Sequence, residues 1–279
     1  MAQKLSNLFL KIFAWLLIFI AVAVGFFAAM EAVADSHFAR KLPSYEKQDI
    51  TAVLEKEEWS EKDYDFLYHQ TGVGKSALDS MKGDNERILS FQEALFYDGE
   101  ITHTWSAFTT PHEKVKDYTA PIIPLENGDV LVTSSTHTLG WTHGHAAIVV
   151  ENFTQSILEA YALGYDSSIG STTWFRQSTN FIVLRLKDKT RAERMAIASE
   201  AVLRLNGVPY SLTVGLFSPK DQGEQPKETN CSHLVWQAFK YAGYDIDPDG
   251  GPICTPRDIA NCNLFEVVQV YGFDVDKLW

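Results

Sequence analysis

The chain has 279 residues, enough for one large domain or two small ones with a sizeable core. Its formal net charge is −12, and the sequence contains no cluster of lysine and arginine residues. Nucleic acid is therefore excluded as an expected partner, because phosphate binding needs clustered positive charge.

An apolar stretch without any charged residue runs from Ile12 to Met30 near the amino terminus. It is close to the roughly 20 residues that cross a bilayer as a helix, and longer than the roughly 7–15 of a signal-peptide core. We therefore expect residues 1–35 to be a retained signal-anchor. The small-x-small sequence Ala32-Val33-Ala34 keeps open the alternative of a cleaved signal and a secreted protein.

The charges that flank this stretch predict its orientation. Lys4 and Lys11 precede it, whereas Glu31 and Asp35 follow it. The positive-inside rule then places the amino terminus in the cytoplasm and the rest of a single-pass membrane protein outside. Under either alternative the remainder of the chain is exported.

Residues 36–120 are predicted to form a short linker and a helical extension. Ser60 followed by Asp63 resembles a capping box ahead of an apolar helical pattern. Two more short helices are expected near 76–81 and 86–96. This extension is expected to pack on the main domain.

Residues 121–279 are predicted to form an α+β domain with an antiparallel sheet packed on one central helix. The first three expected strands form an antiparallel meander, and a helix at 191–205 follows the fourth. The expected strands lie at 130–132, 145–151, 156–161, 181–186 and 265–270.

A helix is expected to begin at Cys231 and to close at Gly243. Thr229 or Asn230 can cap it, and the apolar residues that follow recur at helical spacing. Unpaired N–H groups and the helix dipole favour a thiolate in the first turn, so Cys231 is a candidate nucleophile. The alternative for this residue is a small apolar group buried at a helix start.

His145 and Glu159 are expected to lie together near this thiol. A hairpin that turns around residues 152–154 would place position 145 beside about 159, on one face of the sheet. Cys231 would then attack a carbonyl, His145 would keep the thiolate and protonate the leaving group, and Glu159 would orient the imidazole. The backbone N–H of Cys231 is the expected oxyanion donor. Taken singly, the histidine and the glutamate could equally be ordinary structural or solvent-facing residues.

Three further residues are candidates for substrate contact. They are His143, which shares the face of His145 if the strand begins early, Tyr210 before the cysteine, and Ser232 after it. His233 points away from Cys231 on the same helix, so we expect a structural or rim role for it.

A zinc site is the competing interpretation of the same region. The pairs His143-x-His145 and Cys231-x-His233 supply ligand types that zinc accepts. Such pairs on a strand and a helix rarely converge in tetrahedral geometry, so no metal and no cofactor is expected.

Two other cysteines, Cys254 and Cys262, lie eight residues apart in a loop-like stretch rich in glycine and proline. A disulfide between them would fit an exported protein. Two unpaired thiols fit the sequence equally well.

These motifs resemble the circularly permuted papain-fold superfamily of cysteine hydrolases. The resemblance rests on His145-Ala146-Ala147-Ile148-Val149, on a glutamate in the next strand, and on Asn230-Cys231-Ser232-His233-Leu234-Val235. The superfamily includes NlpC-type cell-wall peptidases, a YiiX-like bacterial branch and relatives of lecithin:retinol acyltransferase. In its permuted members the histidine precedes the cysteine, as it does here.

Short supporting matches extend the resemblance over about 121–270. They are Gly128-Asp129-Val130-Leu131, Gly207-Val208-Pro209-Tyr210 and Thr255-Pro256-Arg257-Asp258-Ile259. The acyltransferases carry a second histidine where this chain has Glu159, which favours the YiiX-like branch. The helical extension and the apolar segment lie outside the shared part.

The resemblance implies a permuted papain-like fold and a thiol hydrolase that acts through an acyl-enzyme. Amide hydrolysis, on cell-wall peptide in the bacterial envelope or another amide, is the favoured expectation. One alternative is a lipid-directed acyltransferase or thioesterase with the same three residues. Others are a non-catalytic module that binds peptide or lipid, and a membrane-tethered scaffold whose extension recruits a partner.

Overall fold

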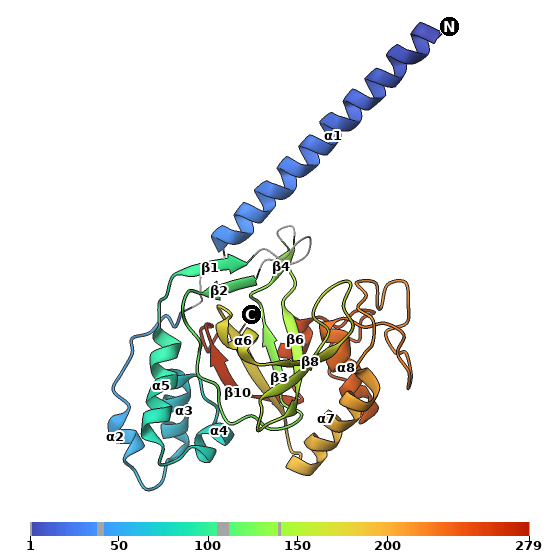
Figure 1. The fold of residues 1–279 in the computed structure, drawn as a ribbon. Helices are drawn as coiled ribbons and strands as arrows, with labels where there is room; N and C mark the ends of the chain where they lie inside the picture. Colours follow the sequence, from blue (N-terminus) through green and yellow to red (C-terminus); the bar gives the residue numbers. More distant parts are fainter. Residues whose placement is uncertain (1, 38–41, 105–111, 139–140, 279) are drawn as a thin grey trace.

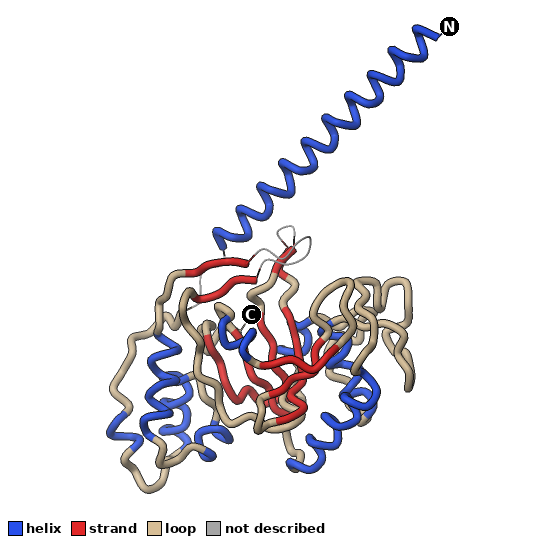
Figure 2. The backbone as a smooth tube through the Cα atoms, viewed as in Figure 1, coloured by secondary structure: helices blue, strands red, loops and turns tan. Residues whose placement is uncertain are grey.

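The computed structural model describes residues 2–37, 42–104, 112–138 and 141–278 (Figure 1). Helix α1 (Ala2–His37) extends away from a body built of a central sheet with helices on both faces (Figures 1 and 2). Leu8–Met30 within α1 is long and apolar enough to cross a membrane, with a mean hydropathy of 2.7. A signal sequence near the amino terminus has the same properties, so the helix alone does not distinguish an anchor from a signal.

Six antiparallel strands form the main sheet in the spatial order β10-β9-β3-β6-β7-β8. Their bounds are β3 (Val130–Thr133), β6 (His145–Glu151), β7 (Ser156–Glu159), β8 (Ser168–Ser171), β9 (Phe181–Leu186) and β10 (Phe265–Tyr271). The predicted α+β class and the antiparallel meander of β3, β6 and β7 are confirmed. The edge strand β8 was not predicted.

The two faces of this sheet carry separate hydrophobic clusters, because successive strand residues point to opposite sides. On β3, Val130 and Val132 face the cluster that contains α7 (Arg191–Leu205) and α8 (Cys231–Tyr241). Leu131, between them, faces the cluster of the amino-terminal helices. The helix that begins at Cys231 is therefore held on one face of the sheet.

The opposite face is covered by the extension. Its helices are α2 (Thr51–Leu54), α3 (Glu61–Thr71), α4 (Lys75–Ser80) and α5 (Asn85–Phe96), and the capping box predicted at Ser60 and Asp63 is present. Leu67 and Phe91 from these helices share one buried cluster with Val149 from the sheet. The extension and the sheet thus form a common core.

Shorter elements complete the fold. Two hairpins absent from the prediction are β1 (Ile101–Thr104) with β2 (His112–Val115), and β4 (His137–Thr138) with β5 (Trp141–Thr142). The short helices are α6 (Thr173–Gln177) and α9 (Pro256–Ala260).

The register between β6 and β7 differs from the prediction. Ile148 lies opposite Leu158, so position 145 would oppose 161, and a bulge near Val149 shifts the pairing toward the turn. The offset is two residues, and an even offset keeps the same face. Glu159 is consequently a diagonal neighbour of His145, which a long side chain can still reach.

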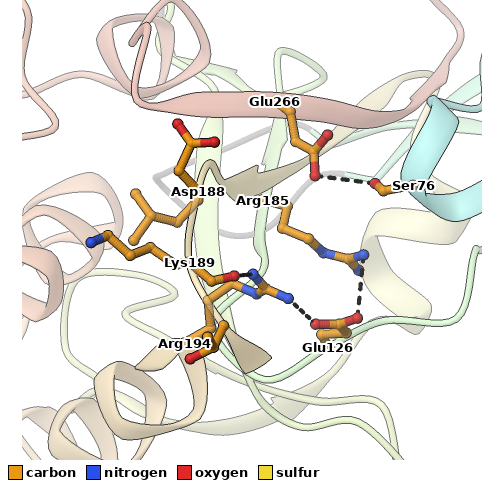
Figure 3. A pocket seen from close by; sticks show the side chains of 9 residues that line it. Ser76, Glu126, Arg185, Asp188, Lys189, Arg194 and Glu266 are labelled. Atoms are coloured by element: carbon orange, nitrogen blue, oxygen red, sulfur yellow. Dashed lines mark hydrogen bonds and ion pairs between the residues drawn. The ribbon is translucent and has the colours of Figure 1, made fainter. Parts of the chain in front are cut away.

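A polar pocket of about 440 Å³ lies at the far end of β3 from Thr133, the partner of His145 (Figure 3). Arg185 donates to both oxygens of Asp129 at 2.8 and 2.7 Å, and Arg194 forms an ion pair with Glu126. Glu126 pairs with both Arg185 and Arg194 at this pocket, so we assign the pocket a role in holding the sheet to α7.

Candidate active site

Cys231 is the first residue of α8 and is 9 % exposed. Asn230 precedes it in an extended conformation, and its side chain accepts a hydrogen bond from the N–H of His233 at 2.9 Å. This cap selects Asn230 over Thr229, and Gly243 follows the helix with a φ of +85° as expected. The sequence therefore positions the sulfur at the positive end of a helix packed on β6.

His145 is the first residue of β6, and its Nε2 lies 2.6 Å from Oε2 of Glu159 at the end of β7. Both side chains are buried, with 6 % and 12 % exposed. A carboxylate in this position accepts the Nε2 proton and fixes the imidazole so that Nδ1 is left for another partner.

Cys231 is the other group that acts on this imidazole, through hydrogen bonding and through charge. Burial alone would lower the pKa of the imidazole, because it penalises the charged form. The hydrogen bonds and negative charges of Cys231 and Glu159 outweigh burial and raise the pKa of His145 to about 10. The imidazole is therefore charged at neutral pH in the presence of the thiolate.

The pKa of the Cys231 thiol moves in the opposite direction. Burial raises it, but the hydrogen bond and positive charge of His145 lower it, with help from the backbone N–H groups of Ala146 and Ser232. The net shift is downward. Both shifts favour a thiolate–imidazolium pair, which is the reactive state of a nucleophilic cysteine.

The backbone N–H of Cys231 has no acceptor among the residues that the structure describes. It belongs to the first turn of α8, whose N–H groups have no partner within the helix. An oxyanion formed by attack of the sulfur on a carbonyl would lie beside this donor.

Aromatic rings pack against His145. Phe175 stacks on the imidazole with ring centroids 5.5 Å apart, and Trp174 meets it edge-on at 5.0 Å. Trp174 in turn stacks on His112 at 3.9 Å. These rings keep water from the imidazole. Sequence reasoning missed them, because the five residues of α6 lie among serines and threonines and resemble a loop.

The three predicted substrate-contact residues have different surroundings. His143 is not on the strand, since β6 begins at His145, and its pKa is lowered by burial and by the nearby charge of His145. Burial and the negative charge of Cys231 raise the pKa of Tyr210. The Ser232 hydroxyl is buried and donates to the carbonyl of Cys254 at 2.7 Å, so it is engaged in holding the following loop.

The alternative zinc ligands do not converge. His233 uses both ring nitrogens, with Nδ1 2.9 Å from Oγ1 of Thr229 and Nε2 2.7 Å from the carbonyl oxygen of Lys220. Among the described residues, the set of possible metal ligands that cluster does not include His143, His145, Cys231 or His233. The expected structural role of His233 is confirmed.

The remaining cysteines, Cys254 and Cys262, are both free and buried. The sequence left open a disulfide between them or two unpaired thiols, and the structure has the unpaired thiols. Burial raises the pKa of each, so neither resembles Cys231.

Comparisons with known proteins add little. No protein-family model matches the chain, and no curated protein matches it. A solved structure described as metalloprotein YiiX from Escherichia coli O157:H7 is similar over 52 % of this chain and 97 % of that one, with 13 % identity and a TM-score of 0.42. The fold is thus similar to a YiiX-like protein in part, at a level that carries no functional argument.

Proposed function

We propose that the chain is a thiol hydrolase with a permuted papain-like fold, in which Cys231, His145 and Glu159 act together. One observation carries the proposal: a buried sulfur at a helix start interacts with an imidazole whose Nε2 lies 2.6 Å from a carboxylate oxygen. Cysteine catalysis requires this order of groups.

The reaction follows from the charges of the three groups. The Cys231 thiolate adds to a carbonyl carbon, and the N–H of Cys231 stabilises the oxyanion. The His145 imidazolium gives its proton to the leaving nitrogen as the carbon–nitrogen bond breaks, which leaves an acyl-enzyme. Neutral His145 then takes a proton from water, the hydroxide displaces the thiolate, and the imidazolium is restored. Glu159 orients the ring through its contact with Nε2.

An amide, for example in cell-wall peptide, is the proposed substrate class, and helix α1 is proposed to anchor the domain outside a membrane with its amino terminus in the cytoplasm. The apolar length of α1 and the flanking charges support this topology. A cleaved signal would export the same active site.

A second candidate substrate class is a long-chain acyl ester or thioester. The loop between Tyr210 and Cys231 exposes Leu212 by 64 %, Leu216 by 59 % and Phe217 by 89 %. Exposed apolar groups on the loop that leads to the nucleophile suit an acyl chain. The chemistry at Cys231 would be unchanged, with only the acyl acceptor or leaving group differing.

Trapping of the acyl-enzyme tests the proposal. The purified chain would be mixed with matched amide, ester and thioester substrates, quenched in acid, and digested for mass spectrometry. We expect an acyl adduct on the Cys231 peptide that disappears as product accumulates, and the class with the highest kcat/KM identifies the bond. No adduct from any class, with unmodified Cys231 recovered throughout, would leave a binding module as the better account.

A further inference from the structure

A second group of chemically active side chains lies in the loop that follows α8. Asp245, Asp247 and Asp249 alternate and are followed by Gly250, which has a φ of +64°. The pattern D-x-D-x-D-G opens calcium-binding loops, in which alternate carboxylates turn toward one ion and glycine allows the sharp turn. The usual glutamate is replaced by Pro256, the first residue of α9.

Asp258 on α9 supplies the missing carboxylate. One oxygen from each of Asp247, Asp249 and Asp258 lies within 4.8 Å of the other two. Asp249 accepts from the N–H of Gly251 at 2.7 Å, and Asp258 accepts from the N–H of Thr255 at 2.8 Å. These bonds fix both carboxylates around a common point.

The buried member of the group has an unsatisfied oxygen that points to a missing cation. The Asp247 side chain is 0 % exposed, and its Oδ1 has no hydrogen-bond donor among the described residues. Its Oδ2 is paired with the ammonium of Lys220. The carboxylate of Asp249 is also in contact with that of Asp247. Two touching carboxylates repel each other unless a proton or a cation lies between them.

We propose that Asp247, Asp249 and Asp258 form a calcium site. Three carboxylates against the single ammonium of Lys220 leave room for a divalent charge. The donors are all hard oxygens on a loop, which suits calcium better than the softer transition metals or the strict octahedron of magnesium. With three side-chain ligands, water must complete the shell, so the dissociation constant is expected at about 10⁻⁴–10⁻³ M, as in extracellular modules.

A cation at this site would stabilise two segments that contact the first turn of α8, where Cys231 lies. The carbonyl of Cys254, within the same loop, accepts the Ser232 hydroxyl at 2.7 Å. The carbonyl of Lys220 is held by His233 at 2.7 Å while its ammonium reaches Asp247. A bound cation therefore fixes two segments that contact the first turn of α8. This inference does not depend on the hydrolase proposal, because the ion would bind whether or not Cys231 reacts.

Terbium luminescence on the full chain in detergent tests the site, with Tb³⁺ as the probe and Ca²⁺ as competitor. Trp236 is a nearby sensitiser, since its Nε1 donates to Asp245 at 2.8 Å and its ring lies 4.7 Å from Nζ of Lys220. We expect saturable emission from one ion per chain, displaced by Ca²⁺. We also expect a rise in Tm of roughly 5–10 °C at Ca²⁺ near 100 times Kd.

Two variants localise the ion. Asp249→Asn removes one ligand charge at an exposed position and should weaken Ca²⁺ binding at least tenfold, whereas Asp221→Asn should leave it unchanged. Asp221 is a matched control, because it accepts from the N–H of Gly223 at 3.0 Å in the same local arrangement and lies outside the cluster. The proposal would be overturned if no saturable emission were seen and the Tm did not change. It would also be overturned if folded Asp249→Asn bound Ca²⁺ as tightly as the wild-type chain.

Discussion

Cys231 and Cys254 are the same residue type at similar burial, with 9 % and 2 % exposed, and they differ in ionisation. At the start of α8, the pKa of Cys231 is lowered against the effect of burial. In the loop before α9, burial and the nearby acidic groups raise the pKa of Cys254. Burial therefore does not make a cysteine reactive or inert by itself. The adjacent charge and the available N–H groups decide its state.

Substitution of each cysteine in turn gives the largest expected difference in turnover. Cys231→Ser should lower turnover by about 10⁴-fold or more, because serine is not ionised beside His145. Cys254→Ala should keep turnover within a few-fold and cost stability only. Initial rates on the substrate class found by acyl trapping, with circular dichroism to verify folding, make the measurement. Comparable losses in both variants would show that the two cysteines do not differ as described.

Removal of the imidazole should make Cys231 behave more like Cys254. His145→Ala takes away the hydrogen bond and positive charge that lower the pKa of Cys231. At pH 6 we expect its alkylation by iodoacetamide to slow roughly 10- to 100-fold. Quantitative mass spectrometry of both cysteine peptides measures the ratio of Cys231 alkylation to Cys254 alkylation in one sample. An unchanged ratio would assign the activation to the helix start alone.

Loss of the carboxylate should lower turnover less than loss of the nucleophile does. Glu159→Gln keeps the size of the side chain and removes the charge that accepts the Nε2 proton of His145. Turnover should fall by roughly 10²- to 10⁴-fold, less than for Cys231→Ser, since Glu159 orients the ring and does not attack. A loss as complete as that of the nucleophile would indicate a collapsed site, which the alkylation rate of Cys231 would reveal.

The smallest expected effect concerns the helix cap. Asn230→Ala should destabilise the fold by about 1 kcal/mol, and Thr190→Ala, which removes the cap of α7, should cost about the same. Only the first should slow alkylation of Cys231, because only it alters the helix start beside the sulfur. Denaturant titration gives the stabilities. A slower reaction in both variants would trace the effect to general loosening.

The molecule contains a second buried imidazole–carboxylate pair. His137 Nε2 lies 3.0 Å from Oε1 of Glu113, and both side chains are almost completely buried. It matches His145 and Glu159 in composition, and the interaction of an imidazole with Cys231 is described at His145. A histidine and a carboxylate are thus insufficient evidence for a catalytic site without the third group.

Local patterns in the sequence predicted the helix starts and the principal strands. Asn230 and Gly243 delimit α8 through their own conformational preferences, and short apolar runs rich in β-branched residues revealed β3, β6 and β9. The meeting of Cys231 with His145 was predicted from the resemblance and the hairpin. Their proximity depends on the topology of the sheet, which determines the strand that α8 packs against.

Features that depend on tertiary contacts escaped prediction. The bulge near Val149 was not predicted, since its extra residue has no local signature. Glu159 lies diagonal to His145 because Ile148 pairs with Leu158, two residues from the expected register. Trp174 reaches His145 across 29 positions, and short polar hairpins such as β1–β2 lack the alternation of a half-buried strand. Their positions are set by packing on the sheet and not by their own residues.

The pH dependence of Cys231 alkylation in the wild-type chain tests the central claim most directly. A lowered thiol pKa predicts that Cys231 is alkylated faster than a free thiol at pH values below the free-thiol pKa of about 8.5. An imidazole pKa of about 10 predicts a decline in turnover as His145 loses its proton through about pH 10. Cys254 should remain unreactive throughout. A Cys231 rate that rises tenfold per pH unit toward a midpoint near the free-thiol value of about 8.5 would contradict the thiolate–imidazolium pair.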